Sequence, residues 1–497
     1  MNHWSFCFSI MAIMNLHATA GTASPQTPAN TTTSSATSLA APAAPAALST
    51  GLDAWVGSWR GVVAGQVEIV ITLLNGPRGL EAVVEIPAQG FVMPFDTVRI
   101  TDGRITLELP RIPVRITGVL TTDGRVLEAV WSQGQDTPLS LTREEAAPPP
   151  VTDGKPISLA LDVQLRTRPW LFRADGKMRL AWELLVSNMN RREVSLESID
   201  IVDEKLGRVI QAVDGIPLLA SIERPGQSNL VGLSRLRLKG GTTAVVYLWG
   251  DFDDERQAPS SVVHRITGVV SGHKLTTTAA PFIPQKSTLV FGQPLKGGTW
   301  LANNGPSHTS LHRRVLVTTN GRTMFPECHA IDWGRVDAAG NTFVGDPALL
   351  ASYLAYGQEV LAVSNGTVVG TVDGIAEHTP QEPPPYEVTL DNIAGNSIIL
   401  DIGGGRFVLY AHLKPGSLKV KKGDRVKRGQ VIGLLGNSGN SSEPHLHFQV
   451  SDGPSVLSDD SVPYVFEAYT TSPADGNGQP VPHKNDLPVE RDLVTFP

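Results

Sequence analysis

Two histidines, His445 and His447, stand one residue apart in a Pro-His-Leu-His-Phe stretch near the end of the chain. Side chains alternate faces along a strand, so both imidazoles project to the same side. Two imidazoles on one face can share a metal, or one can bind it while the other transfers protons. His412, in Tyr-Ala-His-Leu, and the upstream carboxylate Asp332 complete a candidate site. This combination predicts a metal-dependent hydrolase, with zinc as the metal.

The elements that position these residues are predicted to be β-strands. The chain has 497 residues, too many for one core, and should divide into about three domains. Its 48 glycines and 37 prolines, with few aromatic residues, indicate many turns and short strands, which predicts an all-β chain. The formal net charge of −7 argues against a nucleic-acid partner, which usually requires a basic face.

The N-terminal segment has the pattern of an export signal. An apolar run over residues 6–16 leads to Ala-Thr-Ala at 18–20, a small-x-small cleavage pattern. We predict a signal peptide over residues 1–20 and a periplasmic or extracellular location after cleavage. A membrane anchor is the alternative, but the apolar run is shorter than the roughly 20 residues that span a bilayer. No later segment is long enough to cross, so we expect no transmembrane segment in the mature chain.

Two proline-rich segments separate the predicted domains. Residues 21–50 are almost entirely Ala, Pro, Thr and Ser, which predicts a flexible linker, and residues 146–155 form a Pro-rich hinge. Between them, residues 51–145 alternate apolar and polar positions and predict a small β-barrel or sandwich with an accessory role. Residues 156–285 show a second such pattern, which fits an immunoglobulin-like β-sandwich.

Chemistry is concentrated in the third domain, predicted over residues 286–470 and followed by an irregular tail over 471–497. Seven of the ten histidines of the mature chain lie between His308 and His447. We expect His308 and His378 in surface loops. An insertion over residues 374–386 contains four prolines and predicts an irregular loop that either borders the substrate cleft or has no role.

The His-Leu-His-Phe motif, the preceding Tyr-Ala-His-Leu, Gly-Asn-Ser-Ile from Gly395 and Gly-Asn-Ser-Gly from Gly436 carry a family resemblance. Over residues 297–450 the chain resembles the lysostaphin-type (M23/LytM-like) zinc metallopeptidases. The resemblance implies a C-terminal duplicated-hybrid-motif β domain behind two small β domains. It also implies a bound Zn²⁺ and an activity on peptide cross-links of bacterial cell walls.

The resemblance also assigns roles to individual residues. Asp332 and His447 match zinc ligands, and His445 matches the general base that takes a proton from the attacking water. His412 matches a second catalytic histidine, which stabilises charge on the attacked carbonyl. The assignment agrees with general chemistry, since a catalytic zinc uses three protein ligands and leaves one position open.

The first zinc ligand departs from the family pattern. The position four residues before Asp332, usually histidine, is Cys328. A thiolate is a sound zinc ligand, whereas the adjacent His329 would face away in a regular strand. A tight turn at residues 320–321 would pair His312 with His329, and a longer loop or bulge would bring it opposite Asp332. His312 also matches a variant subgroup that lacks the usual histidine, so we predict His312 as the third ligand, with Cys328 the next candidate.

The predicted function is that of an exported zinc metalloendopeptidase acting on peptide bonds in peptidoglycan stems or cross-bridges. The alternative is a degenerate LytM-like module that binds cell wall or regulates a partner cell-wall hydrolase without cutting. Such modules arise by loss of a ligand. Asp332, His412, His445 and His447 are all present here, which favours catalysis because a pure scaffold has no need of all four.

Overall fold

The computed structural model describes residues 51–497, apart from residues 77–78, 110–111, 146–157, 228, 320 and 474–478. The predicted signal peptide, linker and Pro-rich hinge lie outside the described residues. The chain divides into two compact units, one around residues 51–145 and one containing residues from 158 to the C-terminus except Val231–Leu233. Among the described residues, no helix has the length and hydrophobicity needed to cross a bilayer.

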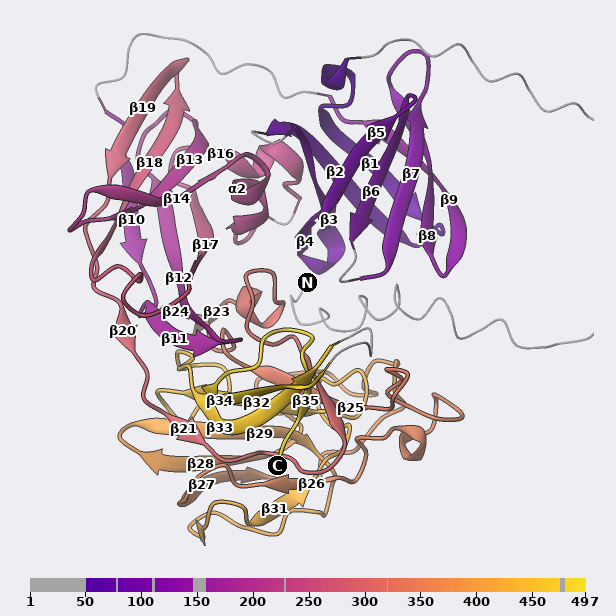
Figure 1. The fold of residues 1–497 in the computed structure, drawn as a ribbon, viewed down its shortest axis with the longest axis vertical. Coiled ribbons are helices and arrows are strands. Elements are labelled where there is room, and N and C mark those ends of the chain that lie inside the picture. Colours follow the sequence, from indigo (N-terminus) through magenta and orange to yellow (C-terminus); the bar gives the residue numbers. More distant parts are fainter. Residues whose placement is uncertain are drawn as a thin grey trace, which may run out of the picture. The chain divides into compact units, whose positions relative to one another are not determined.

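The prediction of an all-β chain is confirmed (Figure 1). The first unit is one antiparallel sheet in the order β4-β3-β2-β1-β9-β8-β7-β6-β5, in which β1 pairs with β9, the last strand of the unit in the chain. Trp59, Ile71 and Leu141 lie in its core. Its strands are β1 (Gly57–Val63), β2 (Val67–Gly76), β3 (Gly79–Ile86), β4 (Phe91–Pro94), β5 (Thr97–Thr101), β6 (Arg104–Leu109), β7 (Val114–Leu120), β8 (Val126–Gln133) and β9 (Gln135–Arg143).

The second unit begins with two sheets, which we call the sandwich domain. One sheet has the order β15-β17-β12-β11-β20, with β10 also on β12, and the other has the order β14-β13-β18-β19, with β16 on β13. The elements are β10 (Leu161–Leu165), β11 (Trp170–Ala174), β12 (Lys177–Asn188), β13 (Val194–Asp203), β14 (Arg208–Asp214), α2 (Gly215–Ser221), β15 (Ile222–Glu223), β16 (Arg237–Leu238), β17 (Thr243–Phe252), β18 (Val262–Val270), β19 (His273–Thr278) and β20 (Gln285–Lys286).

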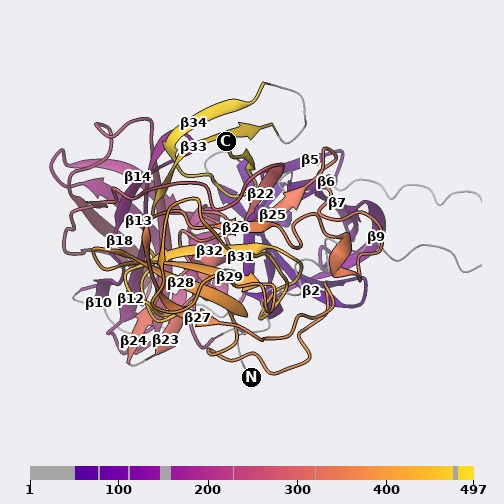
Figure 2. The same cartoon turned by 90° about the horizontal axis from the view of Figure 1, so that it is seen from below.

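An eleven-stranded sheet dominates the C-terminal part, in the order β21-β33-β35-β22-β25-β32-β29-β28-β27-β30, with β34 on β33 (Figures 1 and 2). Two small two-stranded sheets accompany it: β23 with β24, which are consecutive in the chain, and β26 with β31, which are distant in the sequence. The strands are β21 (Val290–Phe291), β22 (Thr299–Asn303), β23 (Val317–Thr319), β24 (Arg322–Met324), β25 (Ile331–Val336), β26 (Glu359–Leu361), β27 (Gly366–Val372), β28 (Asn396–Gly403), β29 (Arg406–Leu413), β30 (Arg425–Val426), β31 (Val431–Leu434), β32 (Leu446–Ser451), β33 (Val465–Ser472), β34 (Val481–Asp486) and β35 (Leu493–Thr495).

The C-terminal residues are not the irregular tail that we expected. β34 pairs with β33, and β35 pairs with both β33 and β22, so the end of the chain belongs to the large sheet. The segment is short and polar, with little apolar alternation, so its strand character comes from partners distant in the sequence. Val494 and Phe496 nonetheless reach the core.

Strand alternation explains how the central strands serve both the core and the site. On β25 and β32, Trp333, Leu446 and Phe448 enter a core rich in aromatic residues. Asp332 and His447 occupy the alternate positions and face the other way. Aromatic side chains bury a large apolar area each, so the sheet beneath the site is held rigidly.

Candidate metal centre and catalytic site

The register of the central sheet brings Asp332 and His447 together. Asp332 on β25 lies directly opposite His447 on β32, and Ala411 on β29 is the partner of His447 on its other side. The Nδ1 atom of His447 lies 2.9 Å from Oδ1 of Asp332. Two residues separated by more than a hundred positions therefore meet because the backbone pairing aligns them.

His312 reaches the same carboxylate from outside the sheet. It begins the 3-10 helix η4 (His312–Arg314), and its Nε2 lies 3.2 Å from Oδ2 of Asp332. The imidazole rings of His312 and His447 are 4.9 Å apart between centroids. Ligand atoms of these three buried residues all lie within 4.8 Å of one another. Two imidazoles and a carboxylate form a ligand set that suits Zn²⁺.

Buried polar partners orient the ligands. The amide of Gln449 donates to the carbonyl of Val456, which leaves Oε1 facing Nε2 of His447 at 2.9 Å. His447 therefore donates from Nε2 and keeps a lone pair on Nδ1, as a metal ligand requires. That lone pair faces the Asp332 carboxylate, and two acceptors this close require a proton or a cation between them. Asn304 donates to the other carboxylate oxygen at 2.9 Å.

His445 and His412 lie beside the three candidate ligands. Nδ1 of His445 is 2.7 Å from the carbonyl of Glu443, and Nδ1 of His412 is 2.8 Å from the carbonyl of Ser438. A carbonyl only accepts, so both Nδ1 atoms donate and both Nε2 atoms face the site in the neutral rings. The two rings are 4.8 Å apart between centroids, and Nε2 of His445 is 3.4 Å from Asp332.

The backbone around His412 is specialised for this arrangement. His412 has φ of 61°, a left-handed conformation that is rare for a residue with a side chain and typical of functional sites. Gly395 lies behind it with φ of 58°, and a Cβ there would come within 2.4 Å of the Ser438 carbonyl. Glycine at 395 therefore lets the carbonyl that holds His412 take its place.

Electrostatics separates the roles of the histidines. Burial alone would raise the pKa of Asp332, but His312 and His445 hold it well below its usual range. Burial would lower the pKa of His445, His312 and His447, yet the Asp332 carboxylate raises each overall. In contrast, burial and the neighbouring imidazoles lower the pKa of His412 well below its usual range. The site therefore contains histidines of different basicity, as acid–base chemistry requires.

Residues 351–458 match the model of Peptidase family M23. The C-terminal domain is a peptidase M23 domain. The match includes His412, His445 and His447 and begins after His312 and Asp332. The resemblance to lysostaphin-type proteins that the motifs predicted is thereby confirmed for this domain.

Curated relatives of the M23 domain include cell-wall endopeptidases. Peptidoglycan DD-endopeptidase ShyA from Vibrio cholerae is 38% identical over 90 residues, which cover 18% of this chain and 18% of ShyA. Glycyl-glycine endopeptidase ALE-1 from Staphylococcus capitis is 36% identical over 91 residues, which cover 17% of this chain and 25% of ALE-1. The matched region thus spans a quarter or less of either relative. The lysostaphin catalytic domain from Staphylococcus simulans aligns with 23% identity and a TM-score of 0.18, covering 35% of this chain and 88% of that structure.

The structure does not bring Cys328 or His329 to the cluster. The Cys328 thiol packs with Val245 and Phe325 and points to Glu183, 3.8 Å away. Burial and the Glu183 carboxylate raise the pKa of the Cys328 thiol well above its usual range, which disfavours the thiolate that binds metals. His329 contacts Ser461 through its backbone and side chain. β23 and β24 pair over only three residues, ending at Thr319 opposite Arg322, and His312 leaves that register in η4.

One further expectation about the histidines is wrong, and a second is met only in part. His378, expected in a surface loop, is buried with 6% of its surface exposed. His308 is part-buried, 3.0 Å from the hydroxyl of Ser221 and 3.3 Å from the guanidinium of Arg313. Both sit in irregular segments that look like loops in sequence, and only the packing around those segments encloses them.

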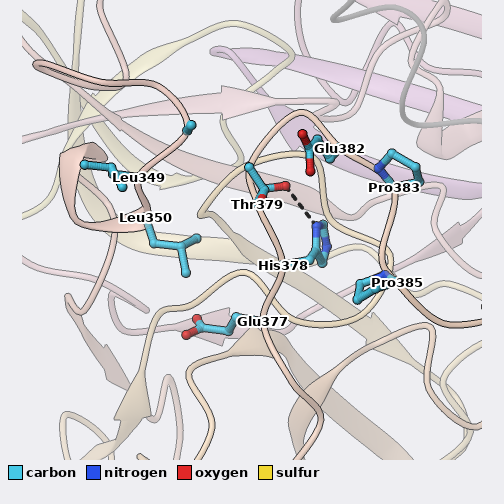
Figure 3. Close-up of a pocket in the computed structure, with 9 residues that line it drawn as sticks. Leu349, Leu350, Glu377, His378, Thr379, Glu382, Pro383 and Pro385 are labelled. Carbon is cyan, nitrogen blue, oxygen red and sulfur yellow. Dashed lines mark hydrogen bonds between the residues drawn. The ribbon is translucent and has the colours of Figure 1, made fainter.

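The 374–386 insertion lines a pocket of about 480 Å³ (Figure 3). Leu349 and Leu350 form one wall, and His378 with neighbouring residues of the insertion forms the other. The Glu377 carboxylate on this wall accepts from the backbone N–H of Asn437 at 2.9 Å. Asn437 in turn accepts from Ser441, whose hydroxyl is 3.2 Å from His445. The pocket wall is therefore hydrogen-bonded to the site.

Sequence reasoning missed Gln449, Asn304 and Glu443. Gln449 could have been found, because it lies two residues after His447 and so shares its face of the strand. Asn304 contacts Asp332 from the loop after β22, and Glu443 contributes a backbone carbonyl, so neither has a signal in the local pattern.

Proposed function

We propose that the chain is an exported zinc metalloendopeptidase that hydrolyses peptide bonds in peptidoglycan. One observation carries the proposal: Asp332 faces the lone pair of His447 at 2.9 Å, with His312 completing a buried set of two imidazoles and a carboxylate. Relatives named as cell-wall endopeptidases support the substrate class. Export rests on the sequence pattern of residues 1–20.

The proposed roles follow from the atoms that each residue presents. His312, Asp332 and His447 would hold the metal, which supplies Lewis acidity toward the peptide carbonyl and the attacking water. His445 is the general base, since its Nδ1 is committed to the Glu443 carbonyl and its Nε2 is open to accept a proton. The raised pKa of His445 keeps that proton available for the leaving amine.

His412 is the proposed second catalytic histidine, and it can act only when its Nε2 carries a proton. Its Nδ1 donates to Ser438, so the neutral ring presents a lone pair at Nε2. It can therefore stabilise negative charge on the attacked carbonyl only after Nε2 gains a proton. Burial and nearby imidazoles lower the pKa of His412, so the ring is neutral before the reaction. Negative charge developing beside it would raise that pKa and favour uptake of a solvent proton at Nε2.

The deciding experiment is digestion of purified cell-wall sacculi by the zinc-loaded mature protein. Mass spectrometry of the soluble products should show peptides that carry newly exposed amino and carboxyl groups. EDTA should abolish their release and added zinc should restore it, and the His445→Ala variant is the matched control. If the zinc-loaded protein sediments with sacculi and releases nothing, the binding-module alternative replaces catalysis.

A further inference from the structure

The candidate ligand His312 has little local support of its own. η4 is a single turn, closed by bonds from the N–H groups of Arg314 and Val315 to the carbonyls of Leu311 and His312. One 3-10 turn is marginal by itself. His312 nonetheless lies buried with its Nε2 aimed at Asp332. The position of this imidazole therefore depends on whatever holds η4.

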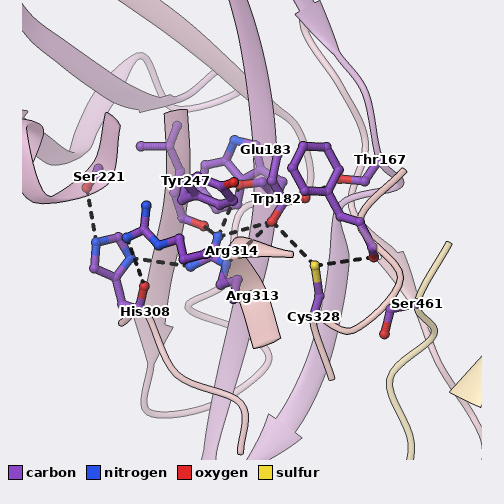
Figure 4. A network of polar contacts seen from close by, with 12 residues as sticks. Thr167, Trp182, Glu183, Ser221, Tyr247, His308, Arg313, Arg314, Cys328 and Ser461 are labelled. Atoms are coloured by element: carbon purple, nitrogen blue, oxygen red, sulfur yellow. Dashed lines mark hydrogen bonds and ion pairs between the residues drawn. The ribbon is translucent and has the colours of Figure 1, made fainter. Parts of the chain in front are cut away.

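Arg313, the next residue, is anchored in the sandwich domain (Figure 4). Its side chain is completely buried, and the guanidinium donates to the Glu183 carboxylate at 3.4 Å and to the Trp182 carbonyl at 3.2 Å. It donates further to the carbonyl of Leu248 and lies 5.3 Å from the Trp249 ring centroid. The planar guanidinium donates to several acceptors at once, which fixes the position of the Arg313 side chain.

Arg314 anchors η4 to the same domain from a second point. Its guanidinium lies 4.1 Å from the Tyr247 ring centroid and donates to the carbonyl of Ala220 in α2 at 2.8 Å. Burial lowers the pKa of Arg314 to about 10, so the side chain remains charged at neutral pH. We call Glu183, Tyr247, Arg313 and Arg314 the arginine clamp (Figure 4).

We propose that the arginine clamp positions His312 for the metal, so that the sandwich domain completes the zinc site of the M23 domain. Arg313 is the principal positioning residue, acting through the backbone of η4 on its neighbour. The inference rests on the proposed zinc site. Cys328 packs against the clamp carboxylate Glu183, away from the cluster, and η4 supplies the imidazole beside Asp332.

The test is metal binding by the full mature chain carrying Arg313→Lys, which keeps the charge and removes the fork. Zinc affinity, measured by competition with a chelating indicator, should fall about 10–100-fold, as for other residues that orient ligands. Arg179→Lys is the matched control. Arg179 lies on β12, as Glu183 does, and pairs with Asp251 on β17, with no contact to η4 among the described residues. The zinc affinity of Arg179→Lys should be unchanged.

A spectroscopic readout separates loss of the His312 ligand from general loosening. With saturating Co²⁺ in place of zinc, the visible spectrum of Arg313→Lys should match that of His312→Ala, while Arg179→Lys keeps the spectrum of the unmutated protein. Unchanged affinity and spectrum in Arg313→Lys would overturn the positioning role alone. A weaker affinity with an unchanged spectrum would also overturn it, since His312 would still be bound. If the unmutated chain binds no zinc, the proposed function fails and this inference fails with it.

Discussion

Asp332 and Glu183 are both buried carboxylates surrounded by basic side chains, but their partners differ in kind. Glu183 faces Arg313 and also accepts from the hydroxyl of Thr167. Guanidinium keeps its charge at every pH that a protein meets. The partners of Asp332 among the described residues are imidazoles and the Asn304 amide, with His447 at 2.9 Å and His312 at 3.2 Å. Imidazoles carry charge only when protonated.

Of the two buried carboxylates, only Glu183 has a partner whose positive charge is permanent. Glu183 has a permanent counter-charge, so the arginine clamp is complete without any ligand. Asp332 is balanced by protons on His312 and His445 or by a metal, and Gln449 turns the His447 lone pair toward it. The charge on Asp332 lacks a permanent counter-charge, which supports the proposal that this cluster takes a cation. The charge on Glu183 has one, which supports a structural role for the arginine clamp.

Asp332→Asn should produce the largest effect, since it removes a proposed ligand and the charge that faces the three histidines. We expect zinc affinity to fall by more than the roughly 100-fold typical of outer partners, with hydrolysis lost. Elemental analysis of the purified variant gives the metal content. If the variant retained about one zinc per chain, Asp332 would not be a ligand and the contrast with Glu183 would disappear.

His445→Gln tests the division of labour within the cluster. The variant should bind zinc normally, while the rate on sacculi should fall about 10²–10⁴-fold, the usual contribution of a general base. Single-turnover rates measured together with metal content distinguish a slower catalytic step from a loss of zinc. Full activity would remove His445 from the role of base, and loss of zinc would make it a ligand instead.

Glu183→Gln tests the clamp side of the comparison. It leaves the Arg313 charge buried without a counter-charge, so unfolding free energy should fall by about 3–5 kcal/mol. Urea unfolding of the metal-free chain measures this loss. The control is Glu197→Gln, which removes an ion pair with Lys274 at the protein surface. A change of less than about 1 kcal/mol, as for a surface pair, would contradict the structural role.

In the metal-free protein, lowering the pH should have opposite effects on the stability contributed by His308, beside the arginine clamp, and by His312, beside Asp332. Burial and the two clamp arginines lower the pKa of His308, so the ring stays neutral in the folded protein. The unfolded chain takes up a proton on this ring as pH falls below the ordinary histidine pKa of about 6.5, so the folded protein becomes less stable there. Asp332 raises the pKa of His312 despite burial, so its stabilising contribution is present below 6.5 and lost as pH rises through the raised value. His308→Asn and His312→Asn should change the pH slope of unfolding in opposite directions, by on the order of 1 kcal/mol for each pKa unit.

Cys328→Ala should have the smallest effect. The thiol packs in the clamp region, away from the cluster, so we expect unchanged zinc content and a stability loss of about 1 kcal/mol from the small cavity. Elemental analysis beside His312→Ala decides between the two candidate ligands. Zinc lost in Cys328→Ala and kept in His312→Ala would reverse the assignment of the third ligand.

Much of the site could be predicted from local patterns. His445 and His447 sit one residue apart, and alternation along an extended chain is a property of the backbone alone. The family motifs placed Asp332 and His412 in the same set, and the structure brings all four together. The position of His312 was harder to predict. A tight turn at residues 320–321 would place it opposite His329, but the strand pairing that follows from this turn extends over only three residue pairs.

The sequence by itself determined that the chain is all-β and that its histidine-rich end carries the chemistry, since strand alternation, turn residues and motifs act over a few neighbouring positions. Only the tertiary structure decided that Cys328 turns toward Glu183, that η4 brings His312 to Asp332, and that residues 481–495 join the large sheet. Each of these depends on contacts between segments far apart in the chain. Such contacts are selected by packing and charge balance in three dimensions, which no local pattern records.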